Sequence, residues 1–299
     1  MIQIEIKLKS RIMLLPMQAL VLLPDEYSKG TDKKNKVLWA LHGGTQDYDS
    51  WLNRVAIDKE LSNYSNVICV IPNGLNSDFA NHSEFGTGYN FSDYFFNELM
   101  PFIYNTFPAS SNPVNNYITG YSMGGAGALM LGLNQATRFN GIAPMGATVR
   151  KSQFLMPYLE MHGYEFRKYA KENRRSFPTE YGDPKEGITD KEINMVARYD
   201  TVADYVKSME CTIDRFFDVV KKENCPEIYF CCGEEDGCTK DVIDFVTVAK
   251  NNGADNVNVE IINGYNHENA ACVTVNTVLR HFFTDKAPKS TEEREWTGK

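Results

Sequence analysis

The amino-acid sequence predicts an α/β fold with a doubly wound, mostly parallel sheet. Two continuous apolar runs, at residues 37–41 and 67–71, are typical of strands that are buried on both faces of a parallel sheet. Segments with strand-like and helix-like spacing alternate along the chain, as the crossovers between parallel strands require. The regular order is interrupted once, by about eighty residues after residue 146, where a crossover needs only about a dozen.

This interruption divides the chain into parts. The long segment is rich in aromatic and aliphatic residues, so it predicts an inserted helical cap, with a structural or oligomer-forming excursion as the alternative. The last fifteen or so residues are charged and poor in apolar side chains, which predicts a loosely ordered tail. The expected division is a core of residues 1–146 and 226–284, an inserted cap or lid of residues 147–225, and a tail of residues 285–299.

The N-terminal half alternates strands with helices. Residues 2–8 alternate apolar with polar side chains, which is the pattern of a strand with one buried face. The other expected strands of this half are rich in β-branched, aliphatic or aromatic side chains and lie at residues 13–23, 37–41, 67–71 and 116–119. Polar capping residues precede the helical spacing of the two expected helices, at residues 50–61 and 92–105.

The C-terminal half continues the alternation on either side of the insertion. A run of small and aliphatic residues at 125–131 predicts a helix that follows the strand at residues 116–119. Apolar runs predict the later strands at residues 141–146, 227–232 and 256–262. Helical spacing predicts the last two helices at residues 240–251 and 270–283.

Charge and the N-terminal pattern exclude two classes of partner. The chain carries 31 basic and 39 acidic residues, a net charge of -8, which argues against a nucleic-acid or anionic-membrane surface. The first 24 residues include four charged side chains, so they lack the uninterrupted apolar run of a signal peptide or a membrane span. We therefore expect a cytoplasmic protein, provided that no leader has been removed.

The cysteines and histidines predict neither disulfides nor a metal site. The seven cysteines form an odd set without metal-ligand spacing, which is typical of small buried side chains in a reducing compartment. No two of the five histidines share a helix face at the spacing of metal ligands. We expect no metal and no organic cofactor.

The motif with the clearest chemistry is Gly-Tyr-Ser-Met-Gly at residues 120–124. It lies between an expected strand and an expected helix, which is the context of a nucleophile elbow. Such a tight turn holds the serine in a strained conformation and needs small flanking residues. Ser122 is therefore the candidate nucleophile, and the amide of Met123 is expected to face the oxyanion that forms when Ser122 attacks a carbonyl.

A serine hydroxyl needs a base and an acid to become a nucleophile at neutral pH. On a sheet of this kind the partners follow in the order serine, acid, histidine, each after a strand. His267 follows the last expected strand and is the expected base. After the preceding strand come three carboxylates, of which Asp236 is the expected acid, because the Asp-Gly turn directs it to the edge of the sheet, and Glu235 is the reserve candidate.

The second amide of an oxyanion hole is expected from the loop after a neighbouring strand. Residues 41–44 read Leu-His-Gly-Gly at the end of a buried strand, and glycines allow the backbone to approach a substrate closely. The amide of Gly44 is therefore expected to join that of Met123. His42 is expected to be a packed, hydrogen-bonded residue at the strand end.

With these residues placed, the chain resembles the putative-esterase family of α/β-hydrolases. That family includes esterase D and S-formylglutathione hydrolase, small bacterial tributyrin and acetyl esterases, and feruloyl and acetylxylan esterases, and the small bacterial esterases are the most similar. The resemblance extends from about residue 37 to residue 267 apart from the insertion. The segments that carry it are residues 41–44, 50–51, 97–101, 120–125, 233–236 and 266–268.

The resemblance implies an α/β-hydrolase fold and a serine carboxylesterase that acts on short-chain acyl esters, acetyl above all. It implies the same roles for Ser122, Asp236, His267, Gly44 and Met123. Acyl transfer to an alcohol and a non-catalytic binding module are the alternatives of another class. S-formylglutathione and feruloylated or acetylated sugars are the alternative substrates, and the oligomeric state is left open, with a homo-oligomer among the options.

Three residues are expected to contact the substrate. Many relatives carry a tryptophan two residues after the catalytic histidine, whereas this chain carries Asn269. That difference is expected to open the wall of the site or make it more polar. Trp51 and Tyr89 are expected to form an aromatic cleft with tyrosines of the insertion, which would favour a carbohydrate-linked ester.

Overall fold

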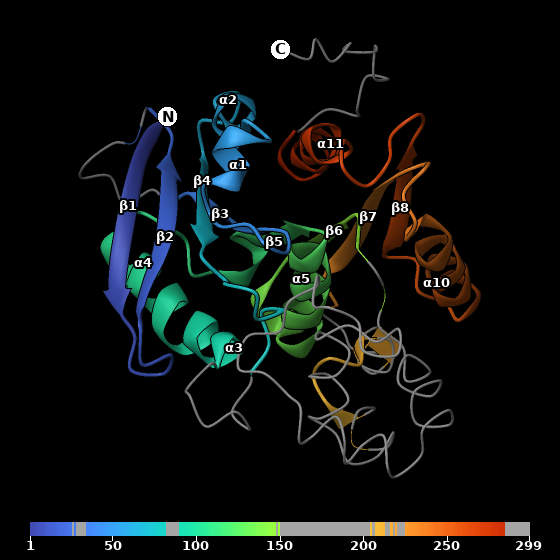
Figure 1. Ribbon diagram of the computed structural model, residues 1–299, viewed down its shortest axis with the longest axis horizontal. Coiled ribbons are helices and arrows are strands. Elements are labelled where there is room, and N and C mark those ends of the chain that lie inside the picture. Colours follow the sequence, from blue (N-terminus) through green and yellow to red (C-terminus); the bar gives the residue numbers. More distant parts are fainter. Residues whose placement is uncertain are drawn as a thin grey trace.

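The computed structural model describes residues 1–25, 27, 34–81, 90–147, 149, 204, 207–212, 216–217, 219 and 225–284 (Figure 1). These residues form an eight-stranded sheet with the order β1-β2-β4-β3-β5-β6-β7-β8. The strands are β1 (Ile2–Lys9), β2 (Pro16–Leu23), β3 (Lys36–Leu41), β4 (Val67–Pro72), β5 (Asn116–Tyr121), β6 (Gly141–Met145), β7 (Glu227–Gly233) and β8 (Val257–Ile262). The six strands from β4 to β8 are parallel, and β1 and β2 add an antiparallel hairpin at one edge.

Helices cover both faces of the sheet, as expected for a doubly wound fold (Figure 1). One face packs against α1 (Ser50–Asn53), α2 (Ile57–Leu61) and α11 (Ala271–Phe283). The other packs against α3 (Phe91–Tyr94), the π-helical turn η2 (Phe95–Leu99), α4 (Met100–Thr106), α5 (Met123–Asn134) and α10 (Thr239–Asn251). Two 3-10 turns, η3 (Pro113–Asn115) and η4 (Ala136–Arg138), flank β5 and α5.

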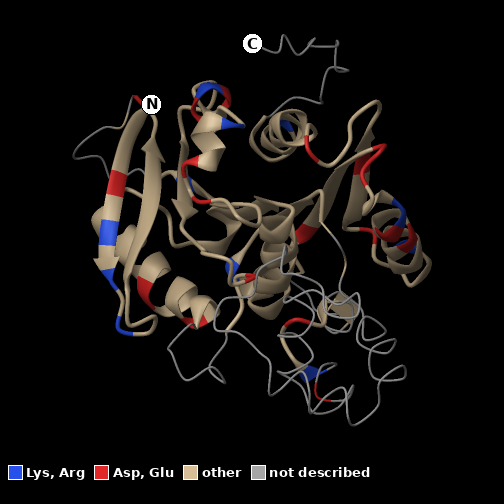
Figure 2. Cartoon of the chain, viewed as in Figure 1, with Lys and Arg blue, Asp and Glu red and all other residues tan. Residues whose placement is uncertain are grey.

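The central strands are buried on both faces because their successive side chains enter opposite layers. In β3, Trp39 and Leu41 belong to the layer of α5, whereas Leu38 and Ala40 belong to the layer of α11. Figure 2 shows that charged residues cluster on β1 and α10 and are nearly absent from the middle of the sheet. The predicted fold class is therefore confirmed.

The second strand is shorter than expected. It begins at Pro16 instead of residue 13, because the preceding residues form a turn. The Met13 amide donates to the Ser10 hydroxyl at 2.8 Å, and the Ser10 amide donates to the Leu15 carbonyl at 3.0 Å. Leu14 adopts a φ of 56°, which a strand does not allow.

Two of the expected helices are interrupted. The helix expected at residues 50–61 is split into α1 and α2 because Ala56 adopts a left-handed φ of 52°. The helix expected at residues 92–105 widens into a π-turn in which the Met100 amide donates to the Phe95 carbonyl. Pro101 explains the wide turn, since it has no amide to donate and its ring would collide with the carbonyl four residues earlier.

Most of the insertion expected as a cap, residues 147–225, lies outside the described residues, and so does the expected tail at residues 285–299. The part that is described packs onto the layer of α5 and α10. The Phe216 ring lies 4.9 Å from the Phe245 ring of α10, centroid to centroid, and the Asn134 side chain at the end of α5 donates to the Met209 carbonyl at 3.1 Å. Among the described helices, none is both long and apolar enough to cross a bilayer.

Candidate active site

The elbow places Ser122 between the end of β5 and the first turn of α5. Its backbone has φ 56° and ψ -119°, a strained conformation for a residue with a side chain. The Ser122 amide donates to the Met145 carbonyl of β6 at 2.9 Å, and its carbonyl accepts from the Ala126 amide at 3.0 Å. The surrounding hydrogen bonds therefore hold the strained serine in place.

A glycine at position 124 allows α5 to start directly against β3. A Cβ there would lie 2.2 Å from the Leu41 carbonyl oxygen and 2.5 Å from the His42 carbonyl oxygen. Such distances are far below van der Waals contact, so any side chain would push the helix off the strand. This close approach brings the loop after β3 beside the first turn of α5, where the two expected oxyanion donors lie.

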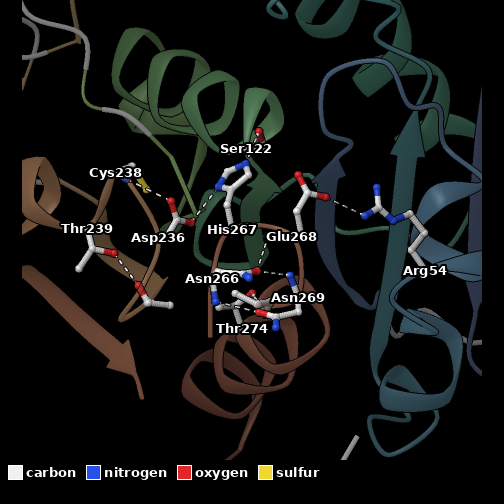
Figure 3. Close-up of polar contacts among 12 residues, drawn as sticks. Arg54, Ser122, Asp236, Cys238, Thr239, Asn266, His267, Glu268, Asn269 and Thr274 are labelled. Carbon is white, nitrogen blue, oxygen red and sulfur yellow. Dashed lines mark hydrogen bonds and ion pairs between the residues drawn. The ribbon is translucent and has the colours of Figure 1, made fainter. Parts of the chain in front are cut away.

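The structure brings Ser122, His267 and Asp236 together in one chain of hydrogen bonds (Figure 3). His267 lies in the loop between β8 and α11, and its Nε2 atom is 3.0 Å from the Ser122 Oγ atom. Its Nδ1 atom is 2.8 Å from Oδ2 of Asp236, which follows β7. Since a carboxylate only accepts, Nδ1 carries the proton and the Nε2 lone pair faces the serine hydroxyl.

Asp236 is fixed at both of its oxygens. Its side chain is 2 % exposed, and its Oδ1 atom accepts from the Cys238 amide at 3.1 Å. Burial alone would raise the pKa of the Asp236 carboxyl, but hydrogen bonds from His267 and from the amide and thiol of Cys238 outweigh it and hold that pKa below its usual range. The carboxylate is therefore ionised at neutral pH and oriented toward the imidazole.

The other two carboxylates of this turn have different surroundings. Glu235 is exposed, and its amide donates to the Tyr265 carbonyl at 2.9 Å. Glu234 accepts from the Gly264 amide at 3.2 Å. These contacts connect the loop after β7 to the loop after β8, and Asp236 is the carboxylate that contacts His267. The role of Asp236 as the catalytic acid stays a prediction.

The loop after β3 is held by His42 and by a neighbouring loop. His42 is 1 % exposed; its Nδ1 atom lies 2.8 Å from the Gly43 carbonyl and its Nε2 atom accepts from the Gly74 amide at 2.8 Å. Burial lowers the pKa of His42, which stays neutral and bridges the two loops. The Thr45 amide donates to the Asn76 side chain at 2.7 Å. Gly44 lies within this fixed segment, and its role as a donor stays a prediction.

Asn269 lies on the loop that carries His267, and its side chain is hydrogen-bonded to the backbone of that loop. Its side chain accepts from the Asn266 amide at 2.8 Å, and the Asn266 side chain accepts from the amides of Glu268 and Asn269 at 3.0 and 3.2 Å (Figure 3). This reciprocal pair resembles a capping box and lies in the turn just before α11. Asn269 thus supports the loop that carries the base, and its contact with a substrate stays a prediction.

The described residues do not form the aromatic cleft that was expected around Trp51 and Tyr89. Trp51 is 2 % exposed and packs in the core layer of α1, α2 and α11, so its ring offers no open face to a sugar. Tyr89 lies outside the described residues, as do the tyrosines of the insertion.

Two contacts of the site were not predicted from the sequence. The Cys238 amide reaches the second oxygen of Asp236 through an Asx turn, a pattern that an Asp two residues before its donor can indicate. The Tyr121 ring lies 5.3 Å from the His267 ring, centroid to centroid. No sequence signal indicates this second contact, because residues 121 and 267 lie on different strand ends. Among the described residues, no group of three or more His, Cys, Asp or Glu side chains is arranged to hold a metal ion.

Comparisons with known proteins identify the family of the chain. Residues 10–272 match the family described as Putative esterase. The acetyl esterase of Caldicellulosiruptor saccharolyticus is 30 % identical over 246 residues, which cover 81 % of this chain and 82 % of the relative.

Two solved structures from Staphylococcus aureus share the fold. The fluorophosphonate-binding serine hydrolase FphF superposes with a TM-score of 0.74 at 22 % identity, over 95 % of this chain and 99 % of that one. The S-formylglutathione hydrolase FrmB superposes with a TM-score of 0.72 at 19 % identity, over the same shares of the two chains. The chain therefore belongs to the Putative esterase family and is a serine hydrolase of carboxylic esters with the α/β-hydrolase fold.

Proposed function

We propose that this esterase hydrolyses short-chain acyl esters, acetyl esters above all, through an acyl-enzyme on Ser122. The observation that carries the proposal is the unbroken hydrogen-bond chain from Asp236 through His267 to the Ser122 hydroxyl, at 2.8 and 3.0 Å. A neutral imidazole at 3.0 Å is within the reach required of a general base. The ionised, buried carboxylate behind it fixes the tautomer that this step needs.

The first half of the reaction forms the acyl-enzyme. Ser122 Oγ attacks the ester carbonyl while His267 Nε2 takes the hydroxyl proton, which gives a tetrahedral oxyanion and an imidazolium. The amides of Gly44 and Met123 donate to the oxyanion, and a single donor of this kind is worth about 3 kcal/mol. His267 then returns its proton to the alkoxy oxygen, the bond from the carbonyl carbon to that oxygen breaks, and the alcohol leaves.

The second half repeats these steps with water. His267 takes a proton from a water molecule, which attacks the acyl carbonyl, and the resulting oxyanion occupies the same two amides. Collapse of this intermediate returns the proton to Ser122 Oγ and releases the carboxylic acid. An alcohol in place of the water would give acyl transfer.

The acyl preference is supported by the relative named acetyl esterase, which is 30 % identical to this chain. S-formylglutathione and feruloyl esters are competing substrates, since solved structures of the same fold are named S-formylglutathione hydrolase and ferulic acid esterase. Acetylated sugars stay a further alternative from the sequence. We also propose that residues 147–225 form a cap that covers the elbow and shapes the acyl or alcohol pocket. A cytoplasmic location is supported by the free thiols of all seven cysteines, and a homo-oligomer stays a prediction.

The test is a rate series on the purified enzyme. We expect kcat/KM for p-nitrophenyl esters to be highest for acetate and to fall as the acyl chain lengthens. Acetylated and feruloylated oligosaccharides and S-formylglutathione, assayed beside them, identify the alcohol. Added acceptor alcohol that gives a transester product faster than free acid would assign acyl transfer instead.

Matched variants connect the activity to the site. Ser122→Ala should lose at least about 10³-fold in kcat, whereas Ser62→Ala, which removes an exposed hydroxyl, should keep the wild-type rate. Folded enzyme without turnover of any of these esters would support a non-catalytic module. Full turnover by Ser122→Ala would overturn the assignment of the nucleophile.

A further inference from the structure

Tyr121 is the residue between Gly120 and the nucleophile, and its ring lies against the base. The ring centroid is 5.3 Å from that of His267, and the two planes are inclined by 32°. Tyr121 is only 8 % exposed. The ring is therefore a fixed wall of the site and not a mobile surface side chain.

The ring and the catalytic acid share a narrow space beside Gly146. A Cβ at position 146 would lie 3.0 Å from Oδ2 of Asp236 and 3.0 Å from Cε2 of Tyr121. The same carboxylate oxygen is hydrogen-bonded to His267. The absence of a side chain at Gly146 thus lets the aromatic ring pack beside both the carboxylate and the imidazole.

The Tyr121 hydroxyl does not account for its position. The oxygen is buried and has no hydrogen-bond partner among the described residues. Burial, with a smaller contribution from the Asp236 charge, raises the pKa of Tyr121, so the side chain stays a neutral phenol. What Tyr121 presents to His267 is an uncharged aromatic ring.

An aromatic face attracts a cation whose distance from the ring centroid is within about 6 Å. His267 is neutral in the resting enzyme that we propose and becomes an imidazolium in each tetrahedral transition state. We propose that the Tyr121 ring stabilises this transient imidazolium by a cation–π interaction and so acts as a positioning residue for the base. The inference rests on the proposed role of His267. Because the attraction is strongest when the charge is present, it lowers the barrier more than it strengthens substrate binding.

Two charged side chains of the described residues lie beside His267 in space or in sequence. Asp236 faces Nδ1 at 2.8 Å. Glu268 is the next residue in the chain, with a side chain that is 80 % exposed and lies 3.5 Å from Arg54 (Figure 3). A substitution that alters only the ring at position 121 leaves these groups in place.

A series of fluorinated phenylalanines at position 121 separates the cation–π interaction from packing. Fluorine withdraws electron density from the ring face while the ring keeps nearly the same shape. Starting from Tyr121→Phe, we expect kcat to fall progressively through the mono-, di- and trifluorinated variants, by about threefold to tenfold in total, with KM unchanged. The acidic limb of the kcat/KM profile should move to lower pH, because the imidazolium is less stabilised.

The same fluorinated residues at Tyr64, which packs on Phe283 of α11, are the control and should leave the rates unchanged. A flat series at position 121 would overturn the proposal, even if Tyr121→Leu loses activity, because shape alone would then explain the loss. Fluorophosphonate labelling of every variant separates the two claims. Labelling at Ser122 with a flat series refutes the role of Tyr121 alone, whereas labelling at another residue refutes the proposed function.

Discussion

Replacement of Asp236 by asparagine isolates the contribution of one buried charge. The substitution keeps the size of the side chain but leaves only one oxygen to accept hydrogen bonds. Oδ1 of Asp236 accepts from the Cys238 amide at 3.1 Å, so the new carbonyl oxygen is expected to keep that bond. The new NH2 group would then face Nδ1 of His267, which accepts from it only in the other tautomer. In that tautomer Nε2 carries the proton and cannot take one from Ser122.

The expected magnitude follows from two contributions. At a separation of roughly 4 Å and an effective dielectric constant near 20, the carboxylate stabilises the imidazolium by about 4 kcal/mol. That energy corresponds to about 10³-fold in kcat. The wrong tautomer adds to this loss, and the corresponding substitution in a serine protease costs about 10⁴-fold. We therefore expect Asp236→Asn to lose between about 10³- and 10⁴-fold.

The assay is steady-state hydrolysis of p-nitrophenyl acetate at neutral pH, with circular dichroism to verify folding. Glu235→Gln is the matched control, since it removes the exposed carboxylate next to the acid and should stay within about twofold of wild type. A folded Asp236→Asn variant that loses less than about tenfold would refute the reasoning. So would a control that loses as much as the variant.

Three further predictions concern stability. Gly124→Ala should lower the free energy of unfolding in urea by about 1–3 kcal/mol, because its Cβ would lie 2.2 Å from the Leu41 carbonyl; an unchanged midpoint would contradict the close approach. Ser122→Gly should be more stable than Ser122→Ala by roughly 1 kcal/mol in the same assay, since glycine tolerates the φ of 56°, and equal stabilities would argue against strain. Because the folded-state pKa of Asp236 is lowered, its stabilisation is present above its unfolded pKa of about 3.9 and is lost as the pH falls through the folded value. The stability difference between wild type and Asp236→Asn, followed by urea unfolding, should therefore shrink below about pH 4, and a difference that grows there would contradict the sign.

The parallel core could be predicted because its signals are local. Residues 37–41 and 67–71 have apolar side chains on both faces of the strand, and only a sheet covered on both faces buries such strands. The adjacent Cys231 and Cys232 likewise lie in opposite layers, because successive side chains of a strand point to opposite faces. Ser122, Asp236 and His267 each follow the carboxyl end of a parallel strand, so the order of the strands places them along the same edge of the sheet.

Other features depend on contacts that no local pattern records. The break at Ala56 occurs within a segment of good helical spacing, and the two short helices that it separates both pack on the sheet. Trp51 was expected at a cleft because an indole can stack on a sugar, but the same apolar surface is buried in the core. The contact between Tyr121 and His267 joins two strand ends that are 146 positions apart in sequence (267 − 121). Periodicity does not extend over such a distance.

The most direct test of the account is the site of covalent labelling by a fluorophosphonate, mapped by mass spectrometry of peptides. The account predicts one adduct per chain, on Ser122, with no adduct in Ser122→Ala and much slower labelling in His267→Ala. Labelling of a different residue, or an unchanged rate in His267→Ala, would contradict the claim that the hydrogen-bond chain through His267 activates Ser122.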